Sequence, residues 1–258
     1  MSLLFPFRKK KFSKGLNSYL TLDNQTMMSF DVLILEEHDT YTIETNNQET
    51  AVLLIQGSTT CTFHNEAYVA ERKNWIKENP VVFHLSKEEH LHIKSNTPSR
   101  FAIIKTNNSE SFPSKIYNRK DIQTEHRGKD ILQGTCYRHV RLAFDQTITH
   151  PNANLVLGEV LNFPGCWSSY PPHHHPQPEI YYYEFDPHQG YGHGELGEQV
   201  YKIKDKDLLM ITDNRDHSQT AAPGYHLYYI WAIRHLENNP YKGFTFTKPH
   251  DKLLSFSE

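Results

Sequence analysis

The 258-residue chain has little of what marks secreted, membrane-spanning or nucleic-acid-binding proteins. Its cysteines, Cys61, Cys136 and Cys166, are odd in number, widely spaced and without a CxxC pair, which favours reduced thiols over a disulfide framework. No apolar run approaches the roughly 20 residues of a membrane helix, and mean hydropathy is -0.67. A formal net charge of -3 is not the basic excess of a nucleic-acid-binding protein. These absences predict a cytoplasmic protein with no membrane and no nucleic-acid partner.

The basic N-terminal stretch FPFRKKKFSKG, residues 5–15, is not followed by a hydrophobic segment of signal-peptide length. We interpret it as a solvated arm rather than an export signal.

Short β-prone runs bounded by Asn, Gly, Pro and Ser follow one another along the chain. In the first half they are 28–37, 41–46, 50–57, 59–64, 80–86, 90–95 and 100–106. In the second half they are 136–144, 153–163, 166–174, 179–185, 190–196, 198–204, 207–212 and 226–233. Each half also contains an apolar strand, a predicted glycine-centred turn and a return strand, in LLIQGSTTCTF and LGEVLNFPGCWSS. The pattern predicts an all-β protein with two β-sandwich or small-barrel domains.

We place the predicted domains at 1–106 and 136–258, with a linker region at 107–135 that opens on a polar stretch rich in Asn and Ser. The size of each domain suffices for a hydrophobic core.

The second half contains a pattern typical of a metal site, H-x-H-x3-E in PPHHHPQPEIYYYEF. On a strand His173 and His175 share a face while the histidine between them points away, and a short turn returns Glu179 to the same region. His217, ahead of a later aromatic strand, supplies a fourth ligand. Such a set suits a borderline divalent cation with positions open to substrate, whereas a polar turn among prolines is the alternative interpretation.

The first half has His90-Leu91-His92, but no carboxylate follows at the same spacing, and Lys94 stands where a third inward ligand would be. We therefore predict an ordinary strand there. The asymmetry suggests a degenerate N-terminal domain that supports a functional C-terminal one.

With these residues the sequence resembles the cupins, and its two halves resemble a bicupin. The stretches GCWSSYPPHHH, EIYYYEFDPHQGYG and HSQTAAPGYHLYY resemble the 5-deoxy-glucuronate isomerase family of inositol catabolism and, more distantly, the 5-keto-4-deoxyuronate isomerases. The resemblance is most specific between Arg127 and His235. It carries the metal-ligand roles onto His173, His175, Glu179 and His217.

Two departures from the family pattern are visible. The family usually has a longer insertion between the second histidine and the glutamate, and it usually reads G-Y-H-P where this chain has Arg215-Asp216-His217-Ser218. The first departure affects the segment that would cover the site, and hence substrate identity.

The resemblance implies isomerisation of an aldose uronic acid to a ketose, 5-deoxy-glucuronate to 5-dehydro-2-deoxy-gluconate, without a redox cofactor. Such a reaction moves a proton from C2 to C1 through an enediolate, whose oxyanion must be stabilised. A divalent metal suits this task because it polarises the carbonyl and lowers the pKa of the neighbouring hydroxyl.

Tyr181 and Tyr183 follow Glu179 with period two and are candidate proton carriers or substrate donors, with core packing as the alternative. The substrate carboxylate needs a partner, for which bidentate arginine is usual. Arg127, Arg138 and Arg141 are the candidates, and the sequence does not choose among them.

Several alternatives stay open. The metal is zinc by analogy with the related keto-deoxyuronate isomerases, while manganese, iron and nickel suit the same ligands. The fold also hosts isomerases of other uronates, metal-dependent dioxygenases and sugar-binding proteins without catalysis. Exposed edge strands favour a homo-oligomer of unspecified symmetry.

Overall fold

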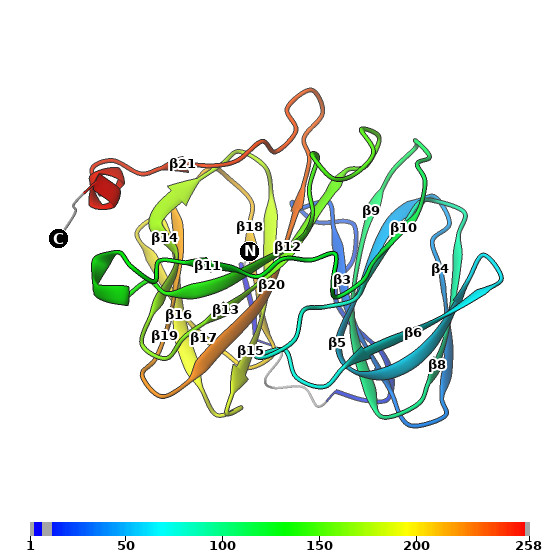
Figure 1. Ribbon diagram of the computed structural model, residues 1–258. Coiled ribbons are helices and arrows are strands. Elements are labelled where there is room, and N and C mark those ends of the chain that lie inside the picture. Colours follow the sequence, from blue (N-terminus) through cyan, green and yellow to red (C-terminus); the bar gives the residue numbers. More distant parts are fainter. Residues whose placement is uncertain (1–2, 7–11, 256–258) are drawn as a thin grey trace. The chain divides into compact units, whose positions relative to one another are not determined.

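A computed structural model describes residues 3–6 and 12–255, so residues 7–11 of the basic stretch at 5–15 lie outside the described residues. The chain divides into two compact units. Unit 1 comprises Met1–Lys10, Thr124–Leu142 and Val156–Glu258, and unit 2 comprises Lys11–Gln123 and Ala143–Leu155. Almost all regular structure is β-strand (Figure 1), which confirms the predicted fold class. Within the described residues, no helix has the length and apolar character to cross a bilayer.

Unit 2 is an antiparallel β-structure with an apolar interior. Its strands are β2 (Gly15–Leu20), β3 (Ser29–Leu35), β4 (Thr40–Glu44), β5 (Gln48–Phe63), β6 (Glu66–Arg72), β7 (Val82–Leu85), β8 (His90–Ser95), β9 (Ser99–Asn107) and β10 (Lys115–Tyr117). Its buried core residues, such as Leu54, Phe83 and Phe101, are apolar. On β8 the histidines His90 and His92 are exposed and alternate with buried residues, as predicted for an ordinary strand.

The predicted turn at Gly57 is wrong, because β5 runs through it as a single strand of 16 residues. The first part of β5 pairs with β7 and β9, and the part from Gly57 onward pairs with β6. Gly57 has φ +120, and a Cβ there would lie 2.2 Å from the Ser99 hydroxyl. Glycine is thus needed where the strand passes from one set of partners to the other, not where it reverses.

Unit 1 contains two antiparallel sheets. The seven-stranded sheet has the order β1 (Leu4–Pro6), β18 (Asp207–Ile211), β15 (Glu179–Asp186), β20 (His226–Arg234), β13 (Leu155–Asn162), β12 (Arg138–Phe144) and β11 (Glu125–Arg127). The five-stranded sheet has the order β17 (Gln199–Lys204), β16 (Tyr191–Leu196), β19 (His217–Ala221), β14 (Trp167–His174) and β21 (Thr245–Phe246). Two short 3-10 helices, η2 (Leu132–Gly134) and η3 (His250–Ser255), complete the unit. The predicted turn between 157 and 169 is present, with Gly165 at φ +75 between β13 and β14.

The two sheets of unit 1 enclose a core that contains both aliphatic and aromatic side chains. Tyr181, Tyr183 and Phe185 of β15 share this interior with Leu196 and Ala221 of the opposite sheet. Period-two alternation places them on one face, as predicted. The same alternation carries the inward face back to Glu179, so the carboxylate lies at the end of the core between the sheets.

The predicted linker is shared between the units. Residues up to Gln123 belong to unit 2 and those from Thr124 onward to unit 1. The segment Ala143–Leu155 returns to unit 2, where the buried Glu49 carboxylate accepts hydrogen bonds from the backbone N–H groups of Asn154 (2.7 Å) and Leu155 (3.0 Å).

Candidate metal centre

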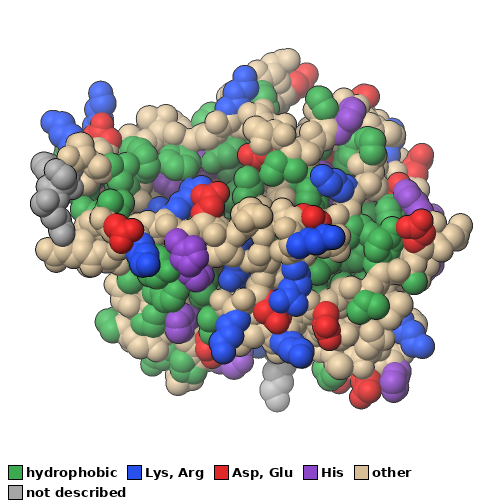
Figure 2. Space-filling view, in the orientation of Figure 1, with side chains coloured by type: hydrophobic (Ala, Val, Ile, Leu, Met, Phe, Trp, Pro, Cys, Tyr) green, Lys and Arg blue, Asp and Glu red, His purple; other side chains and the backbone are tan. Residues whose placement is uncertain are grey.

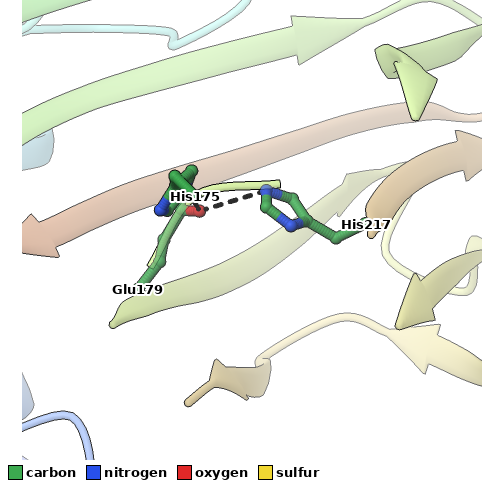
Figure 3. Close-up of side chains that lie close together, drawn as sticks. All are labelled: His175, Glu179 and His217. Carbon is green, nitrogen blue, oxygen red and sulfur yellow. Dashed lines mark hydrogen bonds and ion pairs between the residues drawn. The ribbon is translucent and has the colours of Figure 1, made fainter. Parts of the chain in front are cut away.

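Three of the four predicted ligands converge at one buried point in unit 1. His175 follows the end of β14, Glu179 begins β15 and His217 begins β19. The Glu179 Oε2 atom lies 3.2 Å from His175 Nε2 and 3.4 Å from His217 Nε2. Figure 3 shows the His217 ring directed at this carboxylate, beside His175. Strand pairing explains why the three side chains lie together. β14 and β15 belong to opposite sheets, and His217 of β19 pairs with His173 of β14.

Backbone carbonyls orient the histidine rings. His175 Nδ1 donates to the Gln177 carbonyl at 3.0 Å, and His217 Nδ1 donates to the Arg215 carbonyl at 3.2 Å. Because a carbonyl oxygen can only accept, these contacts place a ring proton on Nδ1 and leave the Nε2 atom of each ring directed at Glu179. The rings are therefore held as metal-binding histidines usually are, with the second nitrogen fixed by a hydrogen bond.

A divalent cation fits this donor set. His217 Nε2 is buried and has no hydrogen-bond partner among the described residues. Burial and then the charge of His173 lower the pKa of His217 to about 3, so the ring is neutral at pH 7. The Nε2 lone pair of the neutral His217 then faces a carboxylate oxygen, an arrangement that a cation would relieve. Ligand atoms about 2.1 Å from one tetrahedral ion stand roughly 3.4 Å apart, close to the separations present.

His173 stands beside this group. The ligand atoms that lie within 4.8 Å of one another belong to His175, Glu179 and His217. The His173 ring centroid is 4.4 Å from that of His217, and its Nδ1 donates to the Ser169 carbonyl at 3.2 Å. His174 points away and pairs with Asp216 at 2.8 Å, as the alternation predicts. The role of His173 as the fourth ligand remains a proposal.

Tyr181 and Tyr183 are both buried, but they differ in their surroundings. The Tyr181 hydroxyl lies 3.5 Å from the Ser169 hydroxyl, and its ring is 6.1 Å from that of His217. The Tyr183 hydroxyl donates to Gln219 Oε1 at 2.8 Å. Burial and then the charge of Glu179 raise the pKa of Tyr181, so it stays protonated at neutral pH. Tyr181 is thus the tyrosine nearer to the histidines, while Tyr183 is engaged deeper in the core.

The structure separates the three candidate arginines. Val140 belongs to the core cluster that contains Tyr181, so Arg138, two residues earlier on β12, shares that inward face. Arg138 donates from Nη1 to the Cys136 carbonyl (2.8 Å) and from Nη2 to the Tyr170 carbonyl (3.1 Å). Its charge also contributes to the pKa values of Tyr229 and His173, after larger contributions from burial.

Arg141 and Arg127 are engaged elsewhere. Arg141 is on the opposite face of β12 from Arg138 and is buried in an ion pair with Glu159 at 2.8 Å. Arg127 is exposed and pairs with Glu125 at 2.7 Å. Both guanidinium groups are thus held by acidic side chains, and neither of these ion pairs involves the histidine cluster.

Sequence reasoning missed the polar groups around Tyr181. Ser169 has φ 52, in the left-handed region, at a register shift between β14 and β19. This bulge directs its carbonyl to His173 and its hydroxyl to Tyr229, at 3.2 Å. Positive φ at a serine leaves no signal in the sequence, because it depends on how β14 pairs with β19.

The fold and the buried cluster together define a bicupin with a candidate metal centre of histidine and glutamate in one unit. The chain belongs to the KduI/IolB family, whose model matches residues 7–253. The family predicted from the sequence is therefore confirmed.

Relatives support this placement. A protein of Bacillus subtilis strain 168 named 5-deoxy-glucuronate isomerase is 29% identical over 214 residues, which cover 78% of this chain and 75% of the relative. A protein of the same name from Halalkalibacterium halodurans is 27% identical over 247 residues, covering 86% and 88%.

Solved structures agree on the fold. An IolB-like protein from Salmonella typhimurium LT2 has a TM-score of 0.87 at 18% identity, with 98% of this chain and 100% of that chain covered. The formate complex of oxalate decarboxylase from Lactobacillus farciminis has a TM-score of 0.70 at 11% identity, covering 100% and 91%. At these identities the likeness concerns architecture alone.

Proposed function

We propose that this protein is a metal-dependent aldose-ketose isomerase that converts 5-deoxy-glucuronate to 5-dehydro-2-deoxy-gluconate. Membership of the KduI/IolB family and the name of the relatives support the reaction class and the substrate. The observation that carries the metal dependence is the buried carboxylate of Glu179, faced by the Nε2 atoms of His175 and His217.

His175, Glu179 and His217, with His173 beside them, would hold the cation. When bound, a divalent metal supplies Lewis-acid chemistry, which polarises the substrate carbonyl and lowers the pKa of the adjacent hydroxyl. We take zinc as the first metal to test, and manganese, iron and nickel as the others that suit nitrogen and carboxylate ligands.

Arg138 would bind the carboxylate of the uronic acid. A guanidinium has five N–H donors, and the carbonyls of Cys136 and Tyr170 fix its orientation through two of them. A preorganised planar donor is suited to bidentate recognition of a carboxylate. Because Arg138 shares the inward face of β12 with Val140, whose core cluster contains Tyr181, a substrate held by its carboxylate would extend into the interior that also contains Tyr181.

Tyr181 would supply a proton to the oxyanion that develops during isomerisation. Its raised pKa keeps the hydroxyl protonated, so it acts as a donor rather than as a base at neutral pH. The hydroxyls of Ser169 and Tyr229 extend the same polar cluster, with Ser169 between the two tyrosines. The proton released from the substrate's C2 hydroxyl as the ketone forms would return to Tyr181 along these hydroxyls.

The test is an anaerobic proton-NMR assay of 5-deoxy-glucuronate in deuterated water, with metal content measured by elemental analysis before and after chelation. We expect conversion that is lost on chelation and restored by added metal. Bound metal without conversion would contradict the isomerase function.

The assay also distinguishes a second candidate. The three converging residues are two histidines and one carboxylate, a set used by non-haem iron oxygenases. Turnover that requires oxygen and iron would support that function, whereas conversion without oxygen supports the isomerase.

A further inference from the structure

The chain returns to the histidine cluster after the last long strand. β20 ends at Arg234, and a tight turn follows in which the Asn239 N–H donates to the Leu236 carbonyl at 3.0 Å. The chain then continues to β21, which pairs with His173 and His174 of β14. We call residues 235–247 the C-terminal strap; it is the orange to red segment that leads to β21 in Figure 1.

Both ends of the strap are tied to residues that adjoin the ligands. At the first end, the Gln177 side chain donates to the Asn239 carbonyl at 2.9 Å, and the carbonyl of Gln177 is the one that orients His175. At the second end, the Thr247 hydroxyl donates to Asp216 at 2.5 Å, next to His217 in sequence. The strap therefore has a fixed position relative to the cluster.

Between these ties, two aromatic rings of the strap lie on two histidine rings. The Tyr241 centroid is 5.0 Å from that of His175, at an interplanar angle of 77°. The Phe244 centroid is 4.2 Å from that of His173, at 39°. The strap therefore places one aromatic ring against each of these two histidines.

Phe244 is partly exposed to solvent although it packs against a buried histidine. Its side chain is 39% exposed although it is large and apolar, whereas His173 beneath it is only 8% exposed. The ring contacts the buried His173 at 4.2 Å and packs against Phe246 with the ring centroids 5.1 Å apart, and the remainder of the residue is exposed to solvent.

We propose that Phe244, held against His173 and Phe246, is a specificity-determining wall beside the metal centre. A sugar acid has apolar C–H faces that pack on an aromatic ring, while its polar groups remain available to Arg138 and to the histidines. The ring would therefore select the substrate by shape and by substituents on the face that meets it. This inference rests on the proposed uronate isomerisation.

Phe244→Ala is the test variant, and Leu254→Ala is its matched control, since Leu254 is a 40% exposed apolar residue that follows the strap in η3. We expect Phe244→Ala to bind one full complement of metal but to lose it to EDTA at least about fivefold faster than wild type. We expect its KM for 5-deoxy-glucuronate to rise about tenfold, which corresponds to about 1.4 kcal/mol, with kcat within about threefold. The ratio of kcat/KM for 5-deoxy-glucuronate to kcat/KM for glucuronate, which carries an additional C5 hydroxyl, should differ from that of wild type. Phe244→Tyr retains the ring and should behave like wild type.

Unchanged EDTA extraction and unchanged KM in Phe244→Ala would overturn the proposal, as would equal effects in Leu254→Ala. A second measurement distinguishes failure of this proposal from failure of the proposed function. If wild type converts neither uronate, the isomerase proposal fails. In that case the dissociation constant for glucuronate is measured from the visible spectrum of the Co²⁺-loaded protein. Weaker binding by Phe244→Ala than by wild type would support the role of Phe244 as a binding wall, and equal binding would refute that role.

Discussion

Replacing Glu179 by glutamine tests the metal centre because it preserves the shape of the side chain and removes its charge. In the metal-free protein, the carboxylate oxygen faces the Nε2 atoms of His175 and His217 at 3.2 and 3.4 Å. An amide offers an N–H donor to the Nε2 lone pair of His217, whose lowered pKa of about 3 keeps it neutral. This acceptor-acceptor contact then becomes a hydrogen bond worth about 1 kcal/mol. The metal-free Glu179→Gln protein should therefore melt about 2–4 °C higher than the metal-free wild type.

The effect on the metal-loaded protein has the opposite sign. Loss of a hydrogen-bonding partner of a ligand already lowers metal affinity about 10- to 100-fold, so loss of a ligand charge should lower it by at least about 100-fold. At a free metal concentration about 100 times the wild-type Kd, stabilisation by metal would fall from about 2.7 to about 0.4 kcal/mol. The metal-induced rise in Tm should decrease from about 5–10 °C to about 1 °C.

Calorimetry at a series of zinc concentrations, with elemental analysis of the same samples, measures both effects. Glu71→Gln is the control, because Glu71 is exposed on β6 of unit 2, outside the unit that contains the candidate ligands, and the substitution makes the same chemical change. A full metal-induced shift in Glu179→Gln would refute the assigned ligand. A metal-free variant that melts below wild type would refute the argument from opposed lone pairs.

Three further outcomes are expected. Arg138→Lys should raise KM for the uronate about tenfold or more, because lysine cannot bind a carboxylate in bidentate fashion, while Arg127→Lys should leave kinetics unchanged. Tyr181→Phe should lower kcat about 100-fold, whereas Tyr183→Phe should lower stability by about 1–3 kcal/mol, because Gln219 loses its donor, and retain kcat. The metal-free wild type should lose stability as pH falls from 6.5 toward 3. The buried His217 has a pKa of about 3 in the folded protein, so in this window the unfolded chain takes up a proton that the folded protein does not. His217→Gln should reduce that dependence, as measured by Tm between pH 7 and pH 5.

Each outcome has a result that would contradict it. Equal KM values for the two arginine variants would remove Arg138 from substrate binding. A larger loss of kcat in Tyr183→Phe than in Tyr181→Phe would reverse the roles of the tyrosines. A pH dependence that is the same with and without His217 would show that another group binds the proton.

Much of the architecture is encoded locally, and the sequence predicts it. Alternation along 179–185 requires no knowledge of neighbouring strands, and it correctly places Tyr181 and Tyr183 inside. By contrast, Gly57 is typical of a turn in isolation. Only its pairing partners reveal that β5 continues through it and changes sheet neighbours.

The chemistry of the site also follows from side-chain types and short spacings. The pattern from His173 to Glu179 specifies a donor set that suits a divalent cation before any strand is paired, and the sequence likewise indicates the family. Which donor atoms approach one another depends on the pairing of β14 with β19 and on the meeting of two sheets.

The remaining features depend on contacts between residues far apart in sequence. Arg138 and Arg141 are alike as sequence, and the fold alone decides that one lines the core with Tyr181 while the other is buried against Glu159. Phe244 carries no motif, and it reaches His173 only because the strap folds back on β14. Residue identity and local alternation thus determined the fold class and the ligand types, whereas non-local strand pairing decided which side chains share the site.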